Sequence, residues 1–245
     1  MGQISIEEQT FSTTVKIVTT QENGVFEQGT GIYYAFFIDG LEFHAVITNR
    51  HVVEGTHKCS FVIRAADSLG NPNYKSNYLF NFDSAKWIYH DSEDLAMIVL
   101  NPNINGDFKK ITNRIPYMNF FNASMIPDTM MERTALPIMD VFMIGYPMGI
   151  TDGVNNIPIL RRGVTATPFF LNFENSHRFL VDIPIFPGSS GSPVIARSSN
   201  GYTLLGIATS SINTNNGMPL NLASVIKSYE ILNLIDKFKK LSFSK

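Results

Sequence analysis

The chain has 245 residues and a net charge of −2; 44% of its residues are hydrophobic and 16% are charged. This composition is typical of a folded globular protein and excludes a disordered chain. Because neutralising nucleic-acid phosphates needs clustered lysine and arginine, it also argues against a nucleic-acid partner.

The first part of the chain has the pattern of successive β-strands. Short runs of β-branched and aromatic residues are separated by Gly, Asn, Asp and Pro, which is typical of an all-β fold. Asp39 and Gly40 lie between two such runs, and they predict a hairpin because both positions of a type I′ turn need a positive φ. The predicted strands cover residues 14–20, 30–38, 41–48, 58–64, 77–82 and 95–100.

Residues 101–137 form a looser Pro- and Asn-containing stretch, which we interpret as the connection between two halves. Ser224 can cap a C-terminal helix that ends near residue 241, in which Ile231, Ile235 and Phe238 form an apolar stripe. The fold class is therefore predicted to be all-β, with two six-stranded antiparallel β-barrels and a C-terminal α-helix. The strands of the second half are predicted at residues 141–144, 159–167, 178–182, 193–196, 203–209 and 219–223.

The single cysteine, Cys59, excludes an internal disulfide and a multi-cysteine metal site, and it favours a reducing compartment. The N-terminus has neither the basic start nor the apolar stretch of a secretory signal. Ile6 stands where a myristoylated Gly2 would require Ser or Thr. No apolar run is long enough to span a membrane. We therefore expect a cytoplasmic protein without membrane association, metal or cofactor.

The segment FPGSSGSPV, residues 186–194, places Ser190 in a glycine-flanked turn before an apolar strand. A serine hydroxyl in such a turn is a candidate nucleophile, but it needs a histidine base and an acid that orients the base. Without those partners, Gly188 and Gly191 would indicate only a tight turn.

The candidate base is His51 in VITNRHVVEG, where an apolar, β-branched strand ends and an imidazole can be exposed. Four other histidines lack this setting. His44 lies inside a strand pattern, whereas His57, His90 and His177 occupy polar, loop-like stretches. A lone histidine is more often structural than catalytic, so the assignment of His51 depends on Ser190.

The candidate acid is Asp94 in SEDLAMIVL, because it directly precedes an apolar run that predicts a buried strand. A carboxylate there can be shielded from water and held against a histidine. Asp91 and Glu93 are competitors, each further into the polar loop. Any one of these acids, taken alone, is more often a solvated loop charge.

The segments TNRHVV, EDLAMIVL and GSSGSP follow one another in the order His, Asp, Ser, and they resemble the trypsin-like (chymotrypsin-fold) serine peptidases. IGYPMG, RRGVTA and LLGIATS are closest to the HtrA-type and glutamyl-endopeptidase-type branches. The resemblance covers about residues 14–241 and implies the chymotrypsin-like double barrel. From the resemblance we expect residues 1–245 to be one peptidase domain without a PDZ domain. Its parts would be a first barrel at 14–100, a connection at 101–137, a second barrel at 138–223 and a helix at 224–241.

Carried over by position, the resemblance implies that His51 is the general base and then the acid, that Asp94 orients it, and that Ser190 is the nucleophile. The backbone N–H groups of Gly188 and Ser190 would form the oxyanion hole. Residues 145–159 order that hole in the family, so we expect activity to be restrained by loop ordering or by a regulatory protein partner. The oligomeric state stays open.

Two departures from the family pattern concern the nucleophile turn. Ser189 replaces the aspartate that receives a new N-terminus in zymogen-activated relatives, so activation by N-terminal cleavage is not expected. Ser192 replaces a glycine, as it does in glutamyl-endopeptidase-like members.

The resemblance also implies the walls of a substrate pocket. Pro184 stands where trypsin-type members carry an acid, and Ala208 stands where glutamyl-specific members carry a histidine. We therefore expect a small or medium apolar residue before the scissile bond. The pocket residues are Ile183, Pro184, Ile185, Ala208, Thr209, Ser210 and Ser211.

Three hypotheses about the function remain open. The first is a serine endopeptidase that acts on protein or peptide substrates. The second is a catalytically silent trypsin-like fold that binds peptides or proteins, and the intact His, Asp and Ser set argues against it. The third is an assembly component whose Tyr and Phe surfaces contact partners, although a barrel core explains the aromatic content equally well.

Overall fold

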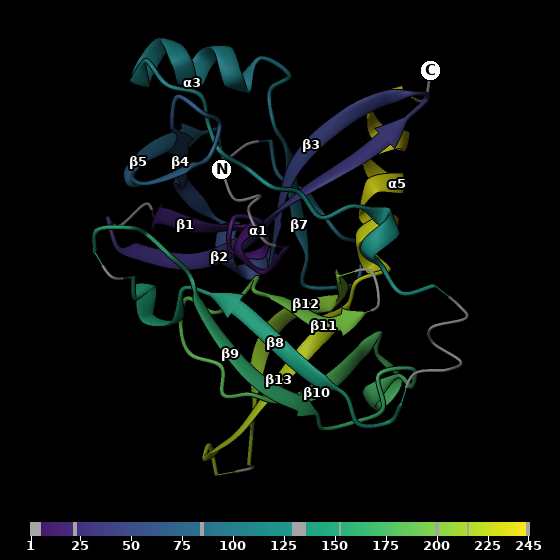
Figure 1. The fold of residues 1–245 in the computed structure, drawn as a ribbon. Coiled ribbons are helices and arrows are strands. Elements are labelled where there is room, and N and C mark those ends of the chain that lie inside the picture. Colours follow the sequence, from purple (N-terminus) through teal and green to yellow (C-terminus); the bar gives the residue numbers. More distant parts are fainter. Residues whose placement is uncertain are drawn as a thin grey trace.

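The computed structural model describes residues 6–21, 24–83, 86–128, 136–151, 153–198, 201–214 and 216–243. Figure 1 shows two β-sheet halves stacked on one another, with a C-terminal helix along one side. The first half holds α1 (Ile6–Phe11), the short helix α2 (Arg50–Val53) and the strands β1 (Thr14–Gln21), β2 (Phe26–Ile38), β3 (Leu41–Thr48), β4 (Thr56–Ala66), β5 (Pro72–Phe82), β6 (Ile88–Tyr89) and β7 (Ala96–Val99).

All six strands predicted in the first half are present, and β6 is an additional two-residue strand. They form an antiparallel seven-stranded sheet in the order β5-β4-β1-β2-β3-β7-β6. The predicted hairpin is confirmed: Ile38 pairs with Leu41, and φ is 50° at Asp39 and 81° at Gly40. The sheet is open, so a closed first barrel is not confirmed.

The second half is the predicted closed six-stranded barrel, in the order β10-β13-β12-β11-β8-β9. Each predicted strand is present, with ends that differ by a few residues. The strands are β8 (Asp140–Gly145), β9 (Ile159–Thr165), β10 (Arg178–Asp182), β11 (Pro193–Ser198), β12 (Gly201–Asn213) and β13 (Pro219–Lys227), with short 3-10 turns at Ala123–Met125, Pro147–Gly149 and Phe173–Asn175.

The connection contains a helix that we did not expect, α3 (Ile104–Thr112). Its N-terminal residues are Asn- and Gly-rich, which obscures the helical period, but Ile104 and Phe108 are four residues apart and both are buried. Asn113 ends the helix in the left-handed region at a φ of 55°. Residues 129–135 of the expected connection lie outside the described residues.

The C-terminal helix α5 is Glu230–Phe243, so the expectation that Ser224 caps it was wrong. Strand β13 continues through Ser224, which pairs with Leu180 of β10 and Ser210 of β12. The apolar stripe is present, and Phe238 packs against the rings of Phe36 and Phe43 at the β2–β3 hairpin.

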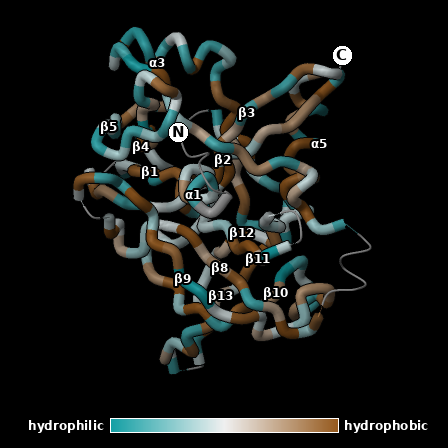
Figure 2. The backbone as a smooth tube through the Cα atoms, in the orientation of Figure 1, coloured by the Kyte–Doolittle hydropathy of each residue, from teal (hydrophilic) through white to brown (hydrophobic). Residues whose placement is uncertain are grey.

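Hydrophobic residues follow the strands, and hydrophilic residues are concentrated on α3 and the turns (Figure 2). One cluster of buried side chains joins the two halves, since it combines Ile32 and Ile47 of the first sheet with Ile144 and Ile207 of the barrel. In the part of the chain that the structure describes, no helix is long and apolar enough to cross a membrane.

Candidate active site

His51 lies on α2, directly after β3. Val52 and Val53 of the same short helix are buried, and this anchors the helix against the first sheet while the His51 side chain stays half-exposed. The Asn49 side chain, fully buried beside it, donates to the carbonyl oxygen of Asp94 at 2.9 Å. The end of β3 and the start of β7 are thereby tied together.

The carboxylate of Asp94 faces His51. Its Oδ2 lies 2.6 Å from His51 Nδ1, and its Oδ1 accepts from the His51 backbone N–H at 3.0 Å. Thr209 Oγ1 of β12 also donates to Oδ2, at 2.6 Å. Burial alone would raise the pKa of Asp94, but the hydrogen bonds from His51 and Thr209 outweigh it and lower the pKa below 3.8. An ionised Asp94 fixes the proton of a neutral His51 on Nδ1 and leaves Nε2 as the acceptor.

The two competing acids are held elsewhere. Exposed Asp91 forms an ion pair with Lys237 of α5. Glu93 is buried and accepts from Arg178 Nε of β10 at 2.9 Å. Within the 90–94 loop, Asp94 is thus the carboxylate that contacts His51.

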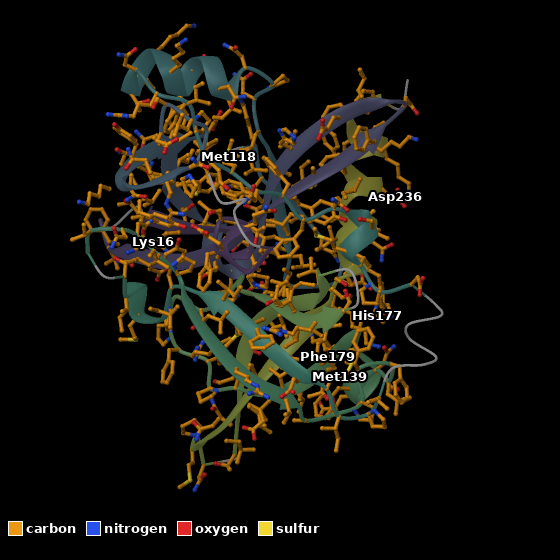
Figure 3. All side chains as sticks on the ribbon, viewed as in Figure 1. Lys16, Met118, Met139, His177, Phe179 and Asp236 are labelled. Atoms are coloured by element: carbon orange, nitrogen blue, oxygen red, sulfur yellow. The ribbon has the colours of Figure 1, made fainter. Side chains whose placement is uncertain are left out.

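His90 and His177 lie in loops, as expected, and both form a cluster around the buried carboxylate of Glu230. His90 Nε2 lies 3.0 Å from Glu230 Oε2 at the start of α5, and His177 Nδ1 contacts the other oxygen of Glu230. The backbone N–H groups of Ser92 and Glu93 both donate to His90 Nδ1. Figure 3 marks His177 below Asp236 of α5. This cluster anchors α5 beside the loop that carries Asp94.

Ser190 lies in a turn whose glycines have φ values of 86° (Gly188) and 89° (Gly191). At Gly191 a Cβ would lie 1.9 Å from the carbonyl oxygen of Thr30, so only glycine fits. Thr30 N donates to Ser190 O at 2.9 Å, which docks the turn onto β2. The Ser190 hydroxyl donates to Thr209 O at 3.2 Å, and among the described residues it has no hydrogen bond to His51.

Two backbone N–H groups of the turn are available to a ligand. In the described part of the chain, neither Gly188 N nor Ser190 N has a hydrogen-bond acceptor. The carbonyls around Gly188 are held: Pro187 O accepts from Met148 N at 2.6 Å, and Gly188 O accepts from Thr30 Oγ1 at 2.7 Å. The N–H groups of Gly188 and Ser190 are therefore the ones in this turn that can donate to a ligand in the cleft.

His51, Ser190 and Gly188 line one cleft of about 430 Å³. Its apolar rim includes the exposed side chains of Phe26 and Met148. The other described residues that line it are Glu27, Gln28, Val52, Gly149 and Pro187.

The predicted pocket residues lie outside that cleft lining. Ile183 and Ala208 are buried in the barrel core. Pro184, Ile185 and Ser211 are half-buried, and Ser210 is exposed. Their role as a substrate pocket remains a prediction.

Three residues support the site in ways that sequence reasoning missed. Thr209 was expected only as a pocket residue, yet it contacts both Asp94 and Ser190. Thr30 and Asn49 hold the backbone on either side of the cleft. Asn49 stands within the TNRHVV motif, which is the only sequence signal for any of these roles. Among the described residues, no group of three His, Cys, Asp or Glu side chains could hold a metal ion.

Comparison with solved structures shows the same fold. The chain aligns with an HtrA-type protease, AlgW with a tripeptide, at a TM-score of 0.55 and 17% identity, over 98% of this chain and 64% of that one. It aligns with the thermostable serine protease AL20 from an extremophilic microorganism at 0.58 and 11%, over 94% and 98% of the two chains. The Rv3671c protease from M. tuberculosis in its active form gives 0.52 and 17%, over 96% and 84%. The chain therefore spans about two thirds of the HtrA-type protease.

Among curated protein sequences, none matches the chain. The profile of the trypsin-like peptidase domain matches residues 29–207, a region that contains His51, Asp94 and Ser190. This match covers most of the chain, and the open sheet, the closed barrel and the cleft between them agree with it. The chain belongs to the trypsin-like peptidase domain family.

Proposed function

We propose that this protein is a serine endopeptidase that hydrolyses peptide bonds in protein substrates through His51, Asp94 and Ser190. The observation that carries the proposal is the 2.6 Å contact between His51 Nδ1 and Asp94 Oδ2, in a cleft that His51 and Ser190 share. An ionised acid that orients a histidine beside a serine is the arrangement that activates a hydroxyl for acyl transfer.

In the proposed reaction, Nε2 of His51 takes the hydroxyl proton while Ser190 Oγ attacks the carbonyl carbon of the scissile bond. The resulting oxyanion accepts hydrogen bonds from the N–H groups of Gly188 and Ser190, each of which contributes about 2.7–4 kcal/mol in such sites. His51 then gives its proton to the leaving nitrogen, and the C–N bond breaks. Water, deprotonated by His51, then attacks the acyl carbon; the ester bond to Ser190 Oγ breaks, and His51 returns the proton to Oγ. Asp94 stays ionised throughout.

Ser190 must turn before attack. Its hydroxyl donates to Thr209 O at 3.2 Å, so rotation about χ1 has to bring it to His51. Exchanging one neutral hydrogen bond for another changes the free energy by about 1 kcal/mol, which substrate binding can supply.

We also propose that the activity is restrained by the ordering of residues 145–159 or by a protein partner. Met148 N and Lys16 Nζ support it, because they donate to Pro187 O and Gly149 O at 2.6 and 2.9 Å. Figure 3 marks Lys16 on β1 of the first sheet, so this contact crosses between the halves. We expect Lys16→Ala to slow active-site labelling, with exposed Lys58→Ala as the control.

The proposal treats residues 1–245 as one peptidase domain in the cytoplasm, a location supported by the single buried thiol of Cys59. The similar HtrA-type protease was solved with a tripeptide, which supports a peptide as the substrate. With Pro184 and Ala208 in the expected pocket, we propose cleavage after a small or medium apolar residue. Profiling on a peptide library tests this, and efficient cleavage after Arg, Lys or Glu contradicts it.

Reaction with a serine-directed phosphonate tests the proposed function. We expect labelling and peptide cleavage by the wild type, and a loss on the order of 10⁶-fold in turnover for Ser190→Ala. Ser198→Ala, at the exposed end of β11, is the matched control and should label like the wild type. Equal labelling of wild type and Ser190→Ala, or no labelling of either, contradicts the proposal.

A catalytically silent fold that binds peptides or proteins is the second candidate. One observation favours it: the Ser190 hydroxyl donates a hydrogen bond to Thr209 O and, among the described residues, has none to His51. This candidate predicts saturable binding of an extended peptide, measured by calorimetry, with neither labelling nor cleavage.

A further inference from the structure

Arg161, at the start of β9, extends its guanidinium to the segment that precedes the nucleophile. Its Nη2 donates to Ser189 Oγ at 3.1 Å, and its Nη1 donates to the carbonyl oxygen of Pro184. The guanidinium carbon lies 5.4 Å from the centre of the Phe186 ring. One planar group therefore contacts three residues of the 184–189 segment, which ends beside Ser190.

These contacts restrain the turn at its two ends. Ser189 is fully buried, and its backbone N–H and carbonyl bond to Phe186 O and Ser192 N at 2.8 and 3.0 Å. Between the two ends lies Gly188, whose φ of 86° is accessible to glycine but is only one of many conformations that glycine adopts. External contacts must therefore select the conformation that presents the Gly188 and Ser190 N–H groups to the cleft.

Arg161 differs from its neighbour Arg162 in having no countercharge within the part of the chain that the structure describes. Among the described residues, no carboxylate lies within ion-pair distance of it, whereas its exposed neighbour Arg162 pairs with Asp140 at 3.0 Å. The Nε of Arg161 is buried and has no hydrogen-bond partner among the described residues, and burial lowers the pKa of the side chain. Holding a half-buried cation on neutral oxygens is unfavourable, so packing alone does not account for an arginine here. Its rigid fork of donors suits two acceptors at a fixed separation, which the single point charge of lysine does not match.

We propose that Arg161 is a positioning residue that holds the oxyanion turn in its reactive conformation through Ser189 and Pro184. This inference rests on the proposed function. Ser189 is also the residue that departs from the aspartate of zymogen-activated peptidases, and its hydroxyl receives a guanidinium from within the chain. The turn is thus set by an internal side chain.

The test compares kcat and KM for peptide cleavage, and the rate of phosphonate labelling, in Arg161→Ala, Arg161→Lys and Ser189→Ala. A displaced oxyanion turn affects the transition state more than the bound substrate, so we expect Arg161→Ala to lower kcat by about 10- to 100-fold with KM within about twofold. Arg161→Lys should restore part of kcat, because it keeps one donor. Arg162→Ala, which removes only a surface ion pair, is the matched control and should match the wild type.

Ser189→Ala keeps the test decisive if Arg161→Ala unfolds, because it deletes one hydroxyl. Like Arg161→Ala, it should lower kcat. The double variant should lose no more activity than Arg161→Ala alone, because Arg161→Ala already removes the contact that Ser189→Ala breaks. Wild-type kcat in Arg161→Ala, multiplicative losses in the double variant, or an equal loss in Arg162→Ala would overturn the inference. Absence of labelling in the wild type itself overturns the proposed function, and the two failures are thereby distinguished.

Discussion

Asp94→Asn is the sharpest perturbation of the proposed mechanism, because both carboxylate oxygens are acceptors in the structure. Oδ1 accepts from the His51 backbone N–H, and Oδ2 accepts from His51 Nδ1 and Thr209 Oγ1. Asparagine keeps only one oxygen. If that oxygen faces the backbone N–H, the amide NH₂ faces Nδ1 and moves the imidazole proton to Nε2, where it blocks proton abstraction from Ser190.

The opposite orientation of the amide directs its NH₂ at the His51 backbone N–H and places two donors face to face. That clash disfavours the opposite orientation, so the first one prevails and the reactive tautomer is lost, which lowers kcat by about 10⁴-fold in this kind of triad, or about 5.5 kcal/mol of transition-state stabilisation. Steady-state cleavage of one peptide at pH 7, with circular dichroism to confirm folding, measures the effect. Retention of more than a tenth of the wild-type kcat by folded Asp94→Asn would refute the assignment of Asp94 as the orienting acid.

Three further outcomes follow from the same contacts. Gly188→Ala should lower kcat by about 10²-fold or more and lower the melting temperature, because its Cβ would lie 2.5 Å from Tyr146 O at a positive φ. Glu230→Ala should lower the free energy of unfolding in urea by about 1–3 kcal/mol, because it leaves the buried Nε2 donor of His90 without its acceptor, whereas exposed Asp236→Ala should change it by less than about 0.5 kcal/mol. The lowered pKa of Asp94 means that the carboxylate stabilises the fold fully above pH 3.8 and loses this effect as pH falls through the folded pKa, so the stability difference between wild type and Asp94→Asn should shrink on acidification.

Local patterns predicted the strands and the hairpin well, because alternation and turn chemistry act over a few residues. Asp39 and Gly40 need no distant partner to form their turn. Sheet closure is different, since it depends on how the first and last strands of a sheet meet, and residue alternation is the same in an open and a closed sheet. For this reason the predicted closure of the first barrel is not confirmed, whereas its strands are.

The C-terminal boundary was missed for a related reason. Ser224 has the side chain of a helix cap, but its neighbours Ala223 and Val225 are buried and pair with β10, so the strand continues through it. Tertiary pairing overrides a local signal there. Similarly, Arg161 reaches Ser189 across 28 positions of the chain, and Glu230 meets His90 from another element. Spacing within a motif carries no information about such contacts.

The two halves hold each other's functional groups. Thr30 of β2, in the first sheet, bonds to Gly188 O and Ser190 O and so supports the nucleophile turn of the barrel. Thr209 of β12, in the barrel, bonds to the carboxylate of Asp94 in the first half. Since support runs in both directions across the interface, a small shift of one half would disturb both the acid and the turn. The arrangement of the site is therefore a property of the interface between the halves, and the hydroxyls of two threonines, which no nucleophile or base motif identifies, connect its parts.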